Sequence, residues 1–255
     1  MKMEEILRTI NTSPFLIILI SSIFGYLIGS VSFARVVHFM VKRTTEIEPF
    51  AEAVPHSDEI FESDLVSATL VSKKIGKKWG CLTSILDLLK VAIPVLLVKY
   101  AWPEEPYFLI TAIFGVIGHN YPLYHGFIGG RGESSILGIL LVINWFGLII
   151  TNAAGFLLSF ITGSVLVMRY AGYVLMIFWY WIYFKDIRYV IFMALIVFLL
   201  WLSMRKDLAR FSQLKTKKGL SFSEEDVSEF ILMGKSPGKM LDKNSLYSLW
   251  KKKHS

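Results

Sequence analysis

Long apolar runs, separated by short polar stretches, follow one another along most of the chain. Several runs approach the roughly 20 apolar residues with which a helix crosses a hydrocarbon layer of about 30 Å. A soluble domain of this length would interrupt such runs sooner with charged residues. The pattern therefore predicts an all-α polytopic membrane protein. We expect seven transmembrane helices, over Pro14–Val41, Gly80–Tyr100, Pro106–Gly118, Ile136–Ile150, Thr151–Met168, Tyr170–Phe184 and Tyr189–Met204.

The distribution of positive charge predicts how these helices are oriented. Of the 255 residues, 54% are hydrophobic and only 18% are charged. Lys and Arg gather between Lys42 and Trp79 and again after Met204, whereas the turn Ala101–Glu105 has none. Cytoplasmic loops of membrane proteins carry the excess of Lys and Arg. We therefore expect the first loop and the C-terminus to be cytoplasmic and, with seven helices, the N-terminus to lie outside.

These assignments divide the chain into three parts. They are an extracytoplasmic segment at 1–13, a membrane domain at 14–205 with a cytoplasmic acidic and basic loop at 42–79, and a basic cytoplasmic tail at 206–255. The net charge of +7 then reflects this topology and attraction to anionic lipid heads. No basic stripe alternates with base-stacking aromatic residues, so we expect no nucleic-acid partner. The expected location is the cell (plasma) membrane.

Two polar stretches interrupt the first two expected helices. Ser30 follows Gly29, which leaves its hydroxyl accessible, and Arg35 lies further along the same helix. Packing of helices through small residues is an alternative explanation that stays open for Gly29 and Ser30. Asp87 and Lys90 are three residues apart and therefore share a helix face as an ion pair. A charged pair inside a transmembrane segment indicates a functional site.

A third polar stretch, residues 118–135, reads GHNYPLYHGFIGGRGESS. Residues 129–132 offer unhindered backbone N–H groups of the kind that cradle phosphate, and a helix beginning near Glu133–Ile136 would add its positive end. Arg131 supplies a planar set of donors suited to phosphate oxygens. His119 is a candidate hydrogen-bond donor or general base, with a structural role as the alternative.

The chain has one cysteine, Cys81, so it forms no internal disulfide and no thiolate metal cluster. We expect this side chain to be a small buried apolar group. We expect neither a metal site nor a cofactor.

The order and spacing of three stretches resemble those of a known family. They are GYLIGSVSFA at 25–34, SATLVSKKIGKKWGCLTSILDLLK at 67–90 and GVIGHNYPLYHGFIGGRGESSILG at 115–138. The chain is similar to the bacterial acyl-phosphate:glycerol-3-phosphate acyltransferases, the PlsY family. This resemblance implies seven membrane spans and transfer of a fatty acyl group from acyl phosphate to glycerol 3-phosphate, giving lysophosphatidic acid in phospholipid biosynthesis. The implied partners are these two substrates and membrane lipids, with the protein a monomer.

The resemblance also implies a set of site residues. It assigns catalytic roles to Ser30, His119 and Arg131. It assigns substrate binding to Thr69, Asp87, Lys90, Gly129, Gly130, Gly132 and Ser135. Arg131 stands where the family has lysine, and Ser135 stands where it has threonine. Both exchanges keep the charge or the hydroxyl.

The chain departs from the family pattern at several other positions. Leu70 replaces an asparagine, Ile128 replaces a lysine, and residues 204–206, where the family has an Arg-His pair after the last span, contain no histidine. An acidic segment is inserted between Thr44 and Asp64. These departures keep a second function open, that of a catalytically degenerate member which binds lipid phosphate or scaffolds other lipid enzymes. A transporter, whose sites also use glycine-broken helices, is a weaker third interpretation.

The tail carries two further patterns. Ser223 precedes acidic residues as a helix N-cap does, which predicts a short helix ending at Gly234. Residues 245–255, SLYSLWKKKHS, combine large apolar side chains with three lysines. This combination suits a membrane surface, and a disordered tail is the alternative.

Overall fold

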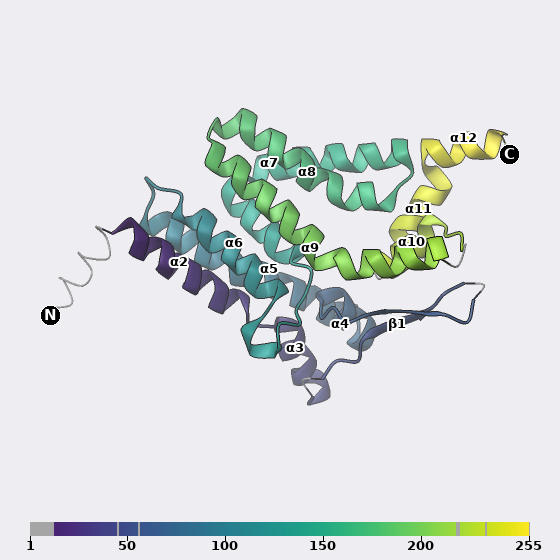
Figure 1. Ribbon diagram of the computed structural model, residues 1–255, viewed down its shortest axis with the longest axis horizontal. Helices are drawn as coiled ribbons and strands as arrows, with labels where there is room; N and C mark the ends of the chain where they lie inside the picture. The colour runs from purple at the N-terminus through teal and green to yellow at the C-terminus, as the bar shows by residue number, and fades with distance from the viewer. Residues whose placement is uncertain (1–12, 45, 56, 218–219, 233, 255) are drawn as a thin grey trace. The chain divides into compact units, whose positions relative to one another are not determined.

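A computed structural model describes residues 13–44, 46–55, 57–217, 220–232 and 234–254 (Figure 1). Of the expected N-terminal segment, residues 1–12 lie outside this description. The chain is helical, as predicted, apart from one hairpin that was not expected. Its elements are α2 (Pro14–Gly29), α3 (Phe33–Lys42), β1 (Phe50–Ala53), β2 (Ile60–Ser63), α4 (Ala68–Ile75), α5 (Lys77–Ala101), α6 (Tyr107–Asn120), η1 (Leu123–His125), α7 (Glu133–Thr162), α8 (Val165–Phe184), α9 (Ile187–Lys217), α10 (Glu224–Leu232), α11 (Ser236–Asn244) and α12 (Leu246–His254).

The elements form two units. The first unit consists of the chain up to Ile47 together with Val66–Ile143, and the second consists of Glu48–Leu65 together with the chain from Asn144 onward. Helix α7 passes from the first unit to the second at Asn144. Because the first unit contains the expected site residues, we describe the two units one at a time.

Five helical stretches among the described residues are long and apolar enough to cross a membrane. They are Pro14–Lys42, Lys77–Ala101, Glu133–Thr162, Val165–Phe184 and Ile187–Thr216. Large apolar side chains on these stretches, such as Phe15, Ile149 and Trp201, are more than half exposed, as a lipid-facing surface requires. The protein is therefore a multi-pass membrane protein. Helix α6, another expected span, has 14 residues and falls short of the usual spanning length.

The first expected helix is broken where we predicted continuity. Helix α2 ends at Gly29 and α3 begins at Phe33, with Ser32 in an extended conformation between them. The Ser30 hydroxyl donates a hydrogen bond of 2.8 Å to the carbonyl of Tyr26. This bond forms at the last turn of α2, although the same kind of bond from Ser22 to Ile18 leaves that helix unbroken.

The predicted division at Thr151–Asn152 is wrong, because α7 continues through both residues. The side chain of Asn152 donates to Leu148 one turn earlier. The helix is interrupted instead at Asn144, where φ is −158° and ψ is 80°. The Asn144 side-chain oxygen accepts a bond of 2.6 Å from the N–H of Gly147, as an N-cap does for a new helix. Helix α7 therefore consists of two segments joined at Asn144.

Glycines bring α2 and α6 into backbone contact in the first unit. A Cβ atom added at Gly25 would overlap the carbonyl oxygen of Thr111, and one at Gly29 would overlap that of Gly115. A Cβ at Gly118 would overlap the carbonyl oxygen of Tyr26. Small residues permit this kind of close approach between membrane helices. The packing alternative proposed for Gly29 is therefore correct for that residue.

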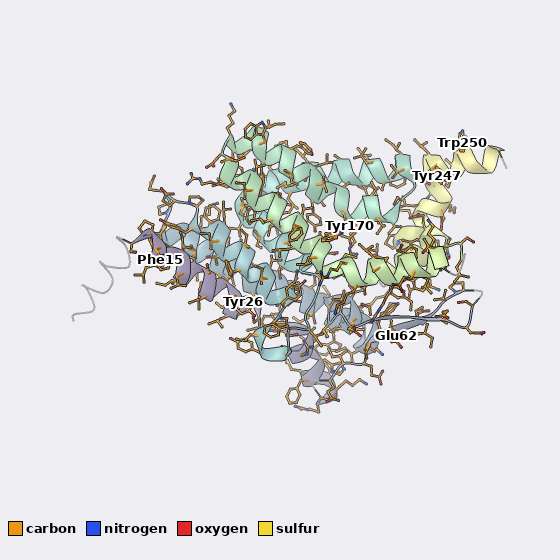
Figure 2. The ribbon with its side chains drawn as sticks, viewed as in Figure 1. Phe15, Tyr26, Glu62, Tyr170, Tyr247 and Trp250 are labelled. Carbon is orange, nitrogen blue, oxygen red and sulfur yellow. The ribbon has the colours of Figure 1, made fainter. Side chains whose placement is uncertain are left out.

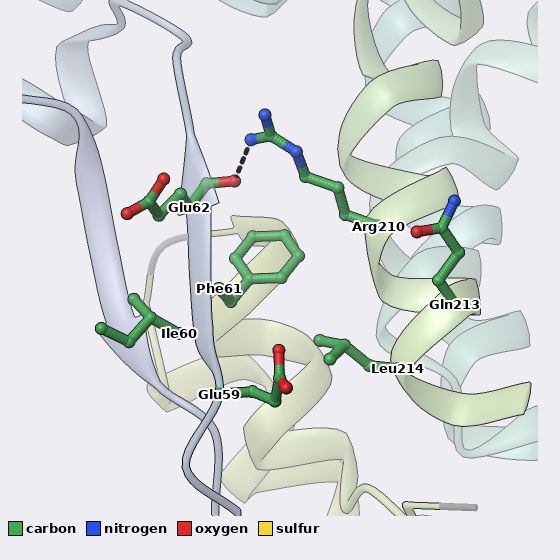
Figure 3. Close-up of a pocket in the computed structure, with 7 residues that line it drawn as sticks. All are labelled: Glu59, Ile60, Phe61, Glu62, Arg210, Gln213 and Leu214. Carbon is green, nitrogen blue, oxygen red and sulfur yellow. Dashed lines mark hydrogen bonds between the residues drawn. The ribbon is translucent and has the colours of Figure 1, made fainter. Parts of the chain in front are cut away.

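The acidic insertion forms an antiparallel hairpin, β1–β2, that packs on α9 in the second unit. The Ser63 hydroxyl donates a bond of 3.0 Å to the buried carboxylate of Asp207. Arg210 donates to the carbonyl oxygen of Glu62 (Figure 3). It also lies 3.6 Å from the Asp64 carboxylate. Phe61 is buried, and its ring centroid lies 5.1 Å from that of Phe230 on α10. The insertion is thus a packed element of the second unit.

Most of the described tail is helical, and residues 246–254, for which a disordered tail was the alternative, form α12. Ser223 and Asp226 exchange hydrogen bonds at the start of α10, because each backbone N–H donates to the side chain of the other residue. This confirms the predicted N-cap. Helix α10 ends at Leu232, close to the predicted end at Gly234.

Candidate active site

A buried ion pair forms the centre of the first unit. Lys90 Nζ lies 2.8 Å from the Asp87 carboxylate, and both side chains are less than 5% exposed. Lys90 also donates a bond of 2.7 Å to the carbonyl of Val31, in the break between α2 and α3. His119 Nδ1 lies 3.6 Å from the same Asp87 oxygen, which is within ion-pair range but too long for a hydrogen bond. Helices α5 and α6 and the break thus meet at one charged cluster.

Ser30 holds the break against the η1 turn. Its side chain is fully buried, and its oxygen accepts a bond of 3.3 Å from the N–H of Leu123 while its proton is donated to Tyr26. The Tyr26 hydroxyl in turn donates to the carbonyl of Tyr121. Ser30 therefore uses both its donor and one acceptor position within the protein. A substrate that binds this hydroxyl would have to replace one of these bonds.

The glycine-rich loop packs directly against His119. A Cβ atom at Gly130 would overlap the Nε2 atom of His119 and would lie 3.1 Å from the carbonyl of Val66. The Gly130 N–H donates a hydrogen bond of 3.2 Å to the carbonyl of His119. The Gly129 carbonyl accepts a hydrogen bond of 3.0 Å from the N–H of Val66. Of the expected anion-binding N–H groups, that of Gly130 is thus bonded within the protein. The loop brings α4, α6 and α7 together at the charged cluster.

The end of the loop requires glycine and starts α7 as predicted. Gly132 has φ +84°, a conformation that residues with side chains rarely adopt. A Cβ there would also lie 2.6 Å from the side-chain oxygen of Asn120. The carbonyl of Gly132 accepts a hydrogen bond of 2.8 Å from the N–H of Ile136, so the helix begins at Glu133. Asn120, which the sequence analysis missed, lies directly beside the predicted site residue His119.

The remaining predicted site residues differ in how closely they join the cluster. Ser135 is fully buried and donates 3.0 Å to the carbonyl of Asp87. Arg131 is only 5% exposed, so its guanidinium is not a solvent-facing group. Thr69 is partly buried in the first turn of α4, and its side chain makes no hydrogen bond to the cluster among the described residues. Thr69 is therefore a predicted site residue that the structure does not connect to the cluster.

A cavity of about 10 Å³ lies at the centre of the cluster, enough for about one water molecule. It is lined by Gly29, Val31, Ser32, Ala34, Val66, Asp87, Lys90, His119, Pro122 and Gly130. Ser32 reaches it because α2 and α3 are separate helices; on one continuous helix it would point away from Ser30. Arg35 donates a hydrogen bond of 3.3 Å to the Ser32 hydroxyl, which connects it to the residues that line the cavity. The site is closed in this structure.

His125, on the exposed side of the site, was not predicted. Its pKa is held below the usual value for histidine, first by partial burial and then by the positive charges of Arg35 and Lys90. Arg35 and Lys90 therefore both act on His125, near the break between α2 and α3, and favour its neutral form. The positive charges of Arg35 and Lys90 favour an anion there. The signal for His125 in the sequence was its place inside the polar stretch at 118–135.

The structure tests the expectation that the Cys81 side chain is buried. Cys81 is exposed on α5, so the prediction that it is buried is wrong. The reason is that a membrane helix exposes apolar side chains to lipid, so an apolar residue type does not indicate burial. Among the described residues, His, Cys, Asp and Glu form no group of three or more that could hold a metal ion.

The fold and the buried cluster define a multi-pass membrane protein that contains a cluster of buried charged and polar side chains. The family model for glycerol-3-phosphate acyltransferase matches residues 55–213. The chain belongs to this family. Because the match begins after Ser30, that residue's assignment rests on the sequence motif and on its contacts alone.

Individual relatives agree with this family assignment. A glycerol-3-phosphate acyltransferase of Mycoplasma capricolum is 32% identical over 64% of this chain and 61% of the relative. That of Desulfotalea psychrophila is 26% identical over 73% of this chain and 90% of the relative. The matched region thus spans about three fifths of the Mycoplasma protein. The crystal structure of PlsY (YgiH), an integral membrane glycerol 3-phosphate acyltransferase, in its lysophosphatidic acid form has a TM-score of 0.59 at 22% identity, covering 82% of this chain and 97% of that one.

Proposed function

We propose that this protein transfers a fatty acyl group from acyl phosphate to glycerol 3-phosphate, forming lysophosphatidic acid at the plasma membrane. The observation that carries the proposal is the buried cluster of Asp87, Lys90 and His119 against the glycine-rich loop, in a chain of this family. A structure of PlsY in a glycerol 3-phosphate form, 23% identical, shares the fold. We expect the protein to act as a monomer without a cofactor.

The reaction requires alignment of two phosphates more than it requires a nucleophilic side chain. The glycerol hydroxyl oxygen attacks the acyl carbonyl carbon, and the bond from that carbon to the phosphate oxygen breaks. The phosphate leaves with the electron pair, and the hydroxyl proton passes to a base. Holding the reactants in line and neutralising the developing charge are the main contributions such a site makes.

The roles of the site residues follow from this requirement. We assign His119 to accept the hydroxyl proton; the contact of its Nε2 atom with Gly130 supports a substrate position at the loop. Lys90, Arg131 and the loop N–H groups bind phosphate oxygens, with Asp87 positioning Lys90. Ser30, Thr69, Gly129, Gly132 and Ser135 complete the substrate site. Lys90 would exchange its bond to Val31 for a phosphate when the break opens.

Seven membrane passes, with the C-terminus cytoplasmic, are part of the same proposal. The bonds from Ser63 to Asp207 and from Arg210 to Glu62 support a position of the first loop and the end of α9 on one side of the membrane. The bond from Val66 to Gly129 supports the same side for the glycine-rich loop. An even number of crossings between Glu133 and the end of α9 follows from this assignment. The break at Asn144 supports two passes within α7, which makes seven in total.

Single-cysteine labelling tests this topology. In a Cys81→Ser background, Ser57→Cys and Lys215→Cys should react with a membrane-impermeant maleimide only after the cells are opened. Glu104→Cys and Lys185→Cys should react in intact cells, because an odd number of passes separates them from the loop. Reaction of Lys185→Cys only in opened cells would show that α7 crosses once.

Acyl transfer is tested with the full chain in proteoliposomes, supplied with palmitoyl phosphate and radiolabelled glycerol 3-phosphate. Gly130→Val should abolish lysophosphatidic acid formation, because the side chain would displace His119. Gly126→Asn is the matched control: Gly126 has φ +59° and open space, and asparagine tolerates this conformation. The control should keep most of the activity. If the wild-type protein forms no product while it binds lipid phosphate, the degenerate function replaces this proposal.

A further inference from the structure

Helix α12 presents an uncovered apolar face. Leu246, Tyr247, Leu249 and Trp250 are each between 51% and 61% exposed. With about 100° of rotation per residue, they span an arc of roughly 160° from Leu249 through Leu246 and Trp250 to Tyr247. Tyr247 and Trp250 can be seen on α12 in Figure 2. Four large side chains on one face of a nine-residue helix require a covering surface.

The start of α12 is attached to the ends of two membrane helices. Gly163 lies in the turn between α7 and α8, and a Cβ atom there would lie 3.0 Å from Tyr247 and 3.1 Å from the Ser245 hydroxyl. The same turn is bonded to α10, because the N–H of Val165 donates 2.7 Å to the Glu224 carboxylate. Helices α7 and α8 both include candidate membrane spans. The turn that joins them therefore lies at the surface of the bilayer, and so does the start of α12.

The apolar surface continues from α12 onto the last turns of α7. Leu157, Leu158 and Ile161 are 64%, 39% and 58% exposed, and they precede the turn at Gly163. These α7 side chains belong to a candidate membrane span, so their cover is lipid. A bilayer that covers α7 to its end also reaches the adjoining face of α12. The occupant of that face is therefore the membrane itself.

Positive charge completes the pattern. Lysines follow Trp250 at positions 251, 252 and 253. Helices that lie in the headgroup region combine an apolar face with Lys or Arg, and anionic lipids attract such residues. We propose that α12 lies in the headgroup region of the bilayer and binds anionic phospholipid, anchoring the tail. This contact lies in the second unit and is separate from acyl transfer.

Spin labelling in lipid nanodiscs tests the proposal on the full chain. In a Cys81→Ser background, a nitroxide is attached at Leu249→Cys, on the apolar face, or at Ser248→Cys, on the opposite face. With phosphatidylcholine and phosphatidylglycerol, the label at 249 should be reached by oxygen and protected from a water-soluble nickel complex. The label at 248 should show the reverse. Equal access of nickel to both labels overturns the proposal, and so does protection of 249 from both reagents, which would mean that protein covers it.

The anionic part of the proposal has its own test. Replacing Lys251, Lys252 and Lys253 with glutamine should lower the ratio of lipid-immersed to water-exposed label at 249, by about fivefold for each lysine. Nanodiscs of phosphatidylcholine alone should produce a similar loss with the wild-type lysines. An unchanged ratio under both conditions would show that α12 binds the membrane without selecting anionic lipid.

Discussion

The two units of the molecule are packed by different side chains. In the first unit, glycines at 25, 29 and 118 let helix backbones touch, and the interior contains the Asp87–Lys90 pair. Most ring contacts among the described residues lie in the second unit, as between Phe61 and Phe230, although glycine also brings backbones together there, at Gly155 against Gly172. The ion pair between Arg188 and Asp186 in that unit is partly exposed.

The first unit contains the residues of the proposed active site. The second unit contains the hairpin and the tail helices. A buried charge is stable only in one geometry, because losing its partner leaves it without compensation. Backbone contact through glycine supplies that fixed geometry. Aromatic rings fill space with broader tolerance of angle and offset. Substitutions in the first unit should therefore affect activity and folding together, whereas those in the second unit should affect folding alone.

The largest effect is expected from Gly25→Val. Its side chain would overlap the carbonyl oxygen of Thr111 and force α2 away from α6. Overpacking a core costs about 1–3 kcal/mol when side chains can move, and here the obstacle is backbone. We expect no folded protein in detergent by size-exclusion chromatography. Gly234→Ala, where nothing lies within 4 Å, should leave the elution profile unchanged.

The next effect is expected from Lys90→Met. It leaves the Asp87 carboxylate buried without its partner, which costs about 3–5 kcal/mol for pairs of this kind. The thermal midpoint should fall sharply, and acyl transfer should be lost. In the second unit, Asp186→Asn breaks the exposed pair with Arg188 and should leave both measurements unchanged. An equal fall in midpoint for the two variants would contradict the contrast between the units.

Phe61→Ala tests the second unit from within. Removing a buried phenylalanine costs about 3–5 kcal/mol, and this ring holds the hairpin against α10. We expect limited proteolysis to cut the chain faster between residues 47 and 66. The rate of acyl transfer per folded molecule should remain near that of the wild type. A loss of activity without faster cleavage would mean that the hairpin serves the chemistry directly.

Local features of the sequence predicted part of this arrangement. The spacing of Asp87 and Lys90, the start of α7 at Glu133 and the cap at Ser223 are each determined by neighbouring residues, and the structure contains all three. The break after Gly29 and the interruption at Asn144 were not predicted. At each of them, a polar side chain forms a hydrogen bond with the backbone.

Features that depend on contacts between distant segments of the chain could not be predicted from the sequence either. The hairpin is held by Asp207 and Phe230, more than a hundred residues further along the chain, so its own acidic sequence does not indicate a packed element. A continuous first helix would turn Ser32 away from Ser30, so Ser32 was not among the expected site residues. Only the broken helix brings it to the cavity beside Lys90.

The smallest effect is expected at Arg131, the predicted phosphate ligand of the loop. A hydrogen bond to a charged group is worth about 1.5–3 kcal/mol, so Arg131→Ala should lower kcat/KM about 10- to 100-fold. Arg131→Lys should keep much of the activity, because it retains the charge.

The matched change in the second unit is Arg210→Ala, at a side chain that is 43% exposed and binds the hairpin. Surface changes of that kind shift free energies by about 0.5 kcal/mol, which corresponds to a change in kcat/KM of about twofold at most. Steady-state rates at several glycerol 3-phosphate concentrations distinguish these outcomes. Equal losses for Arg131→Ala and Arg131→Lys would indicate that the arginine maintains the fold of the loop, and the phosphate would then be bound by Lys90 and the backbone.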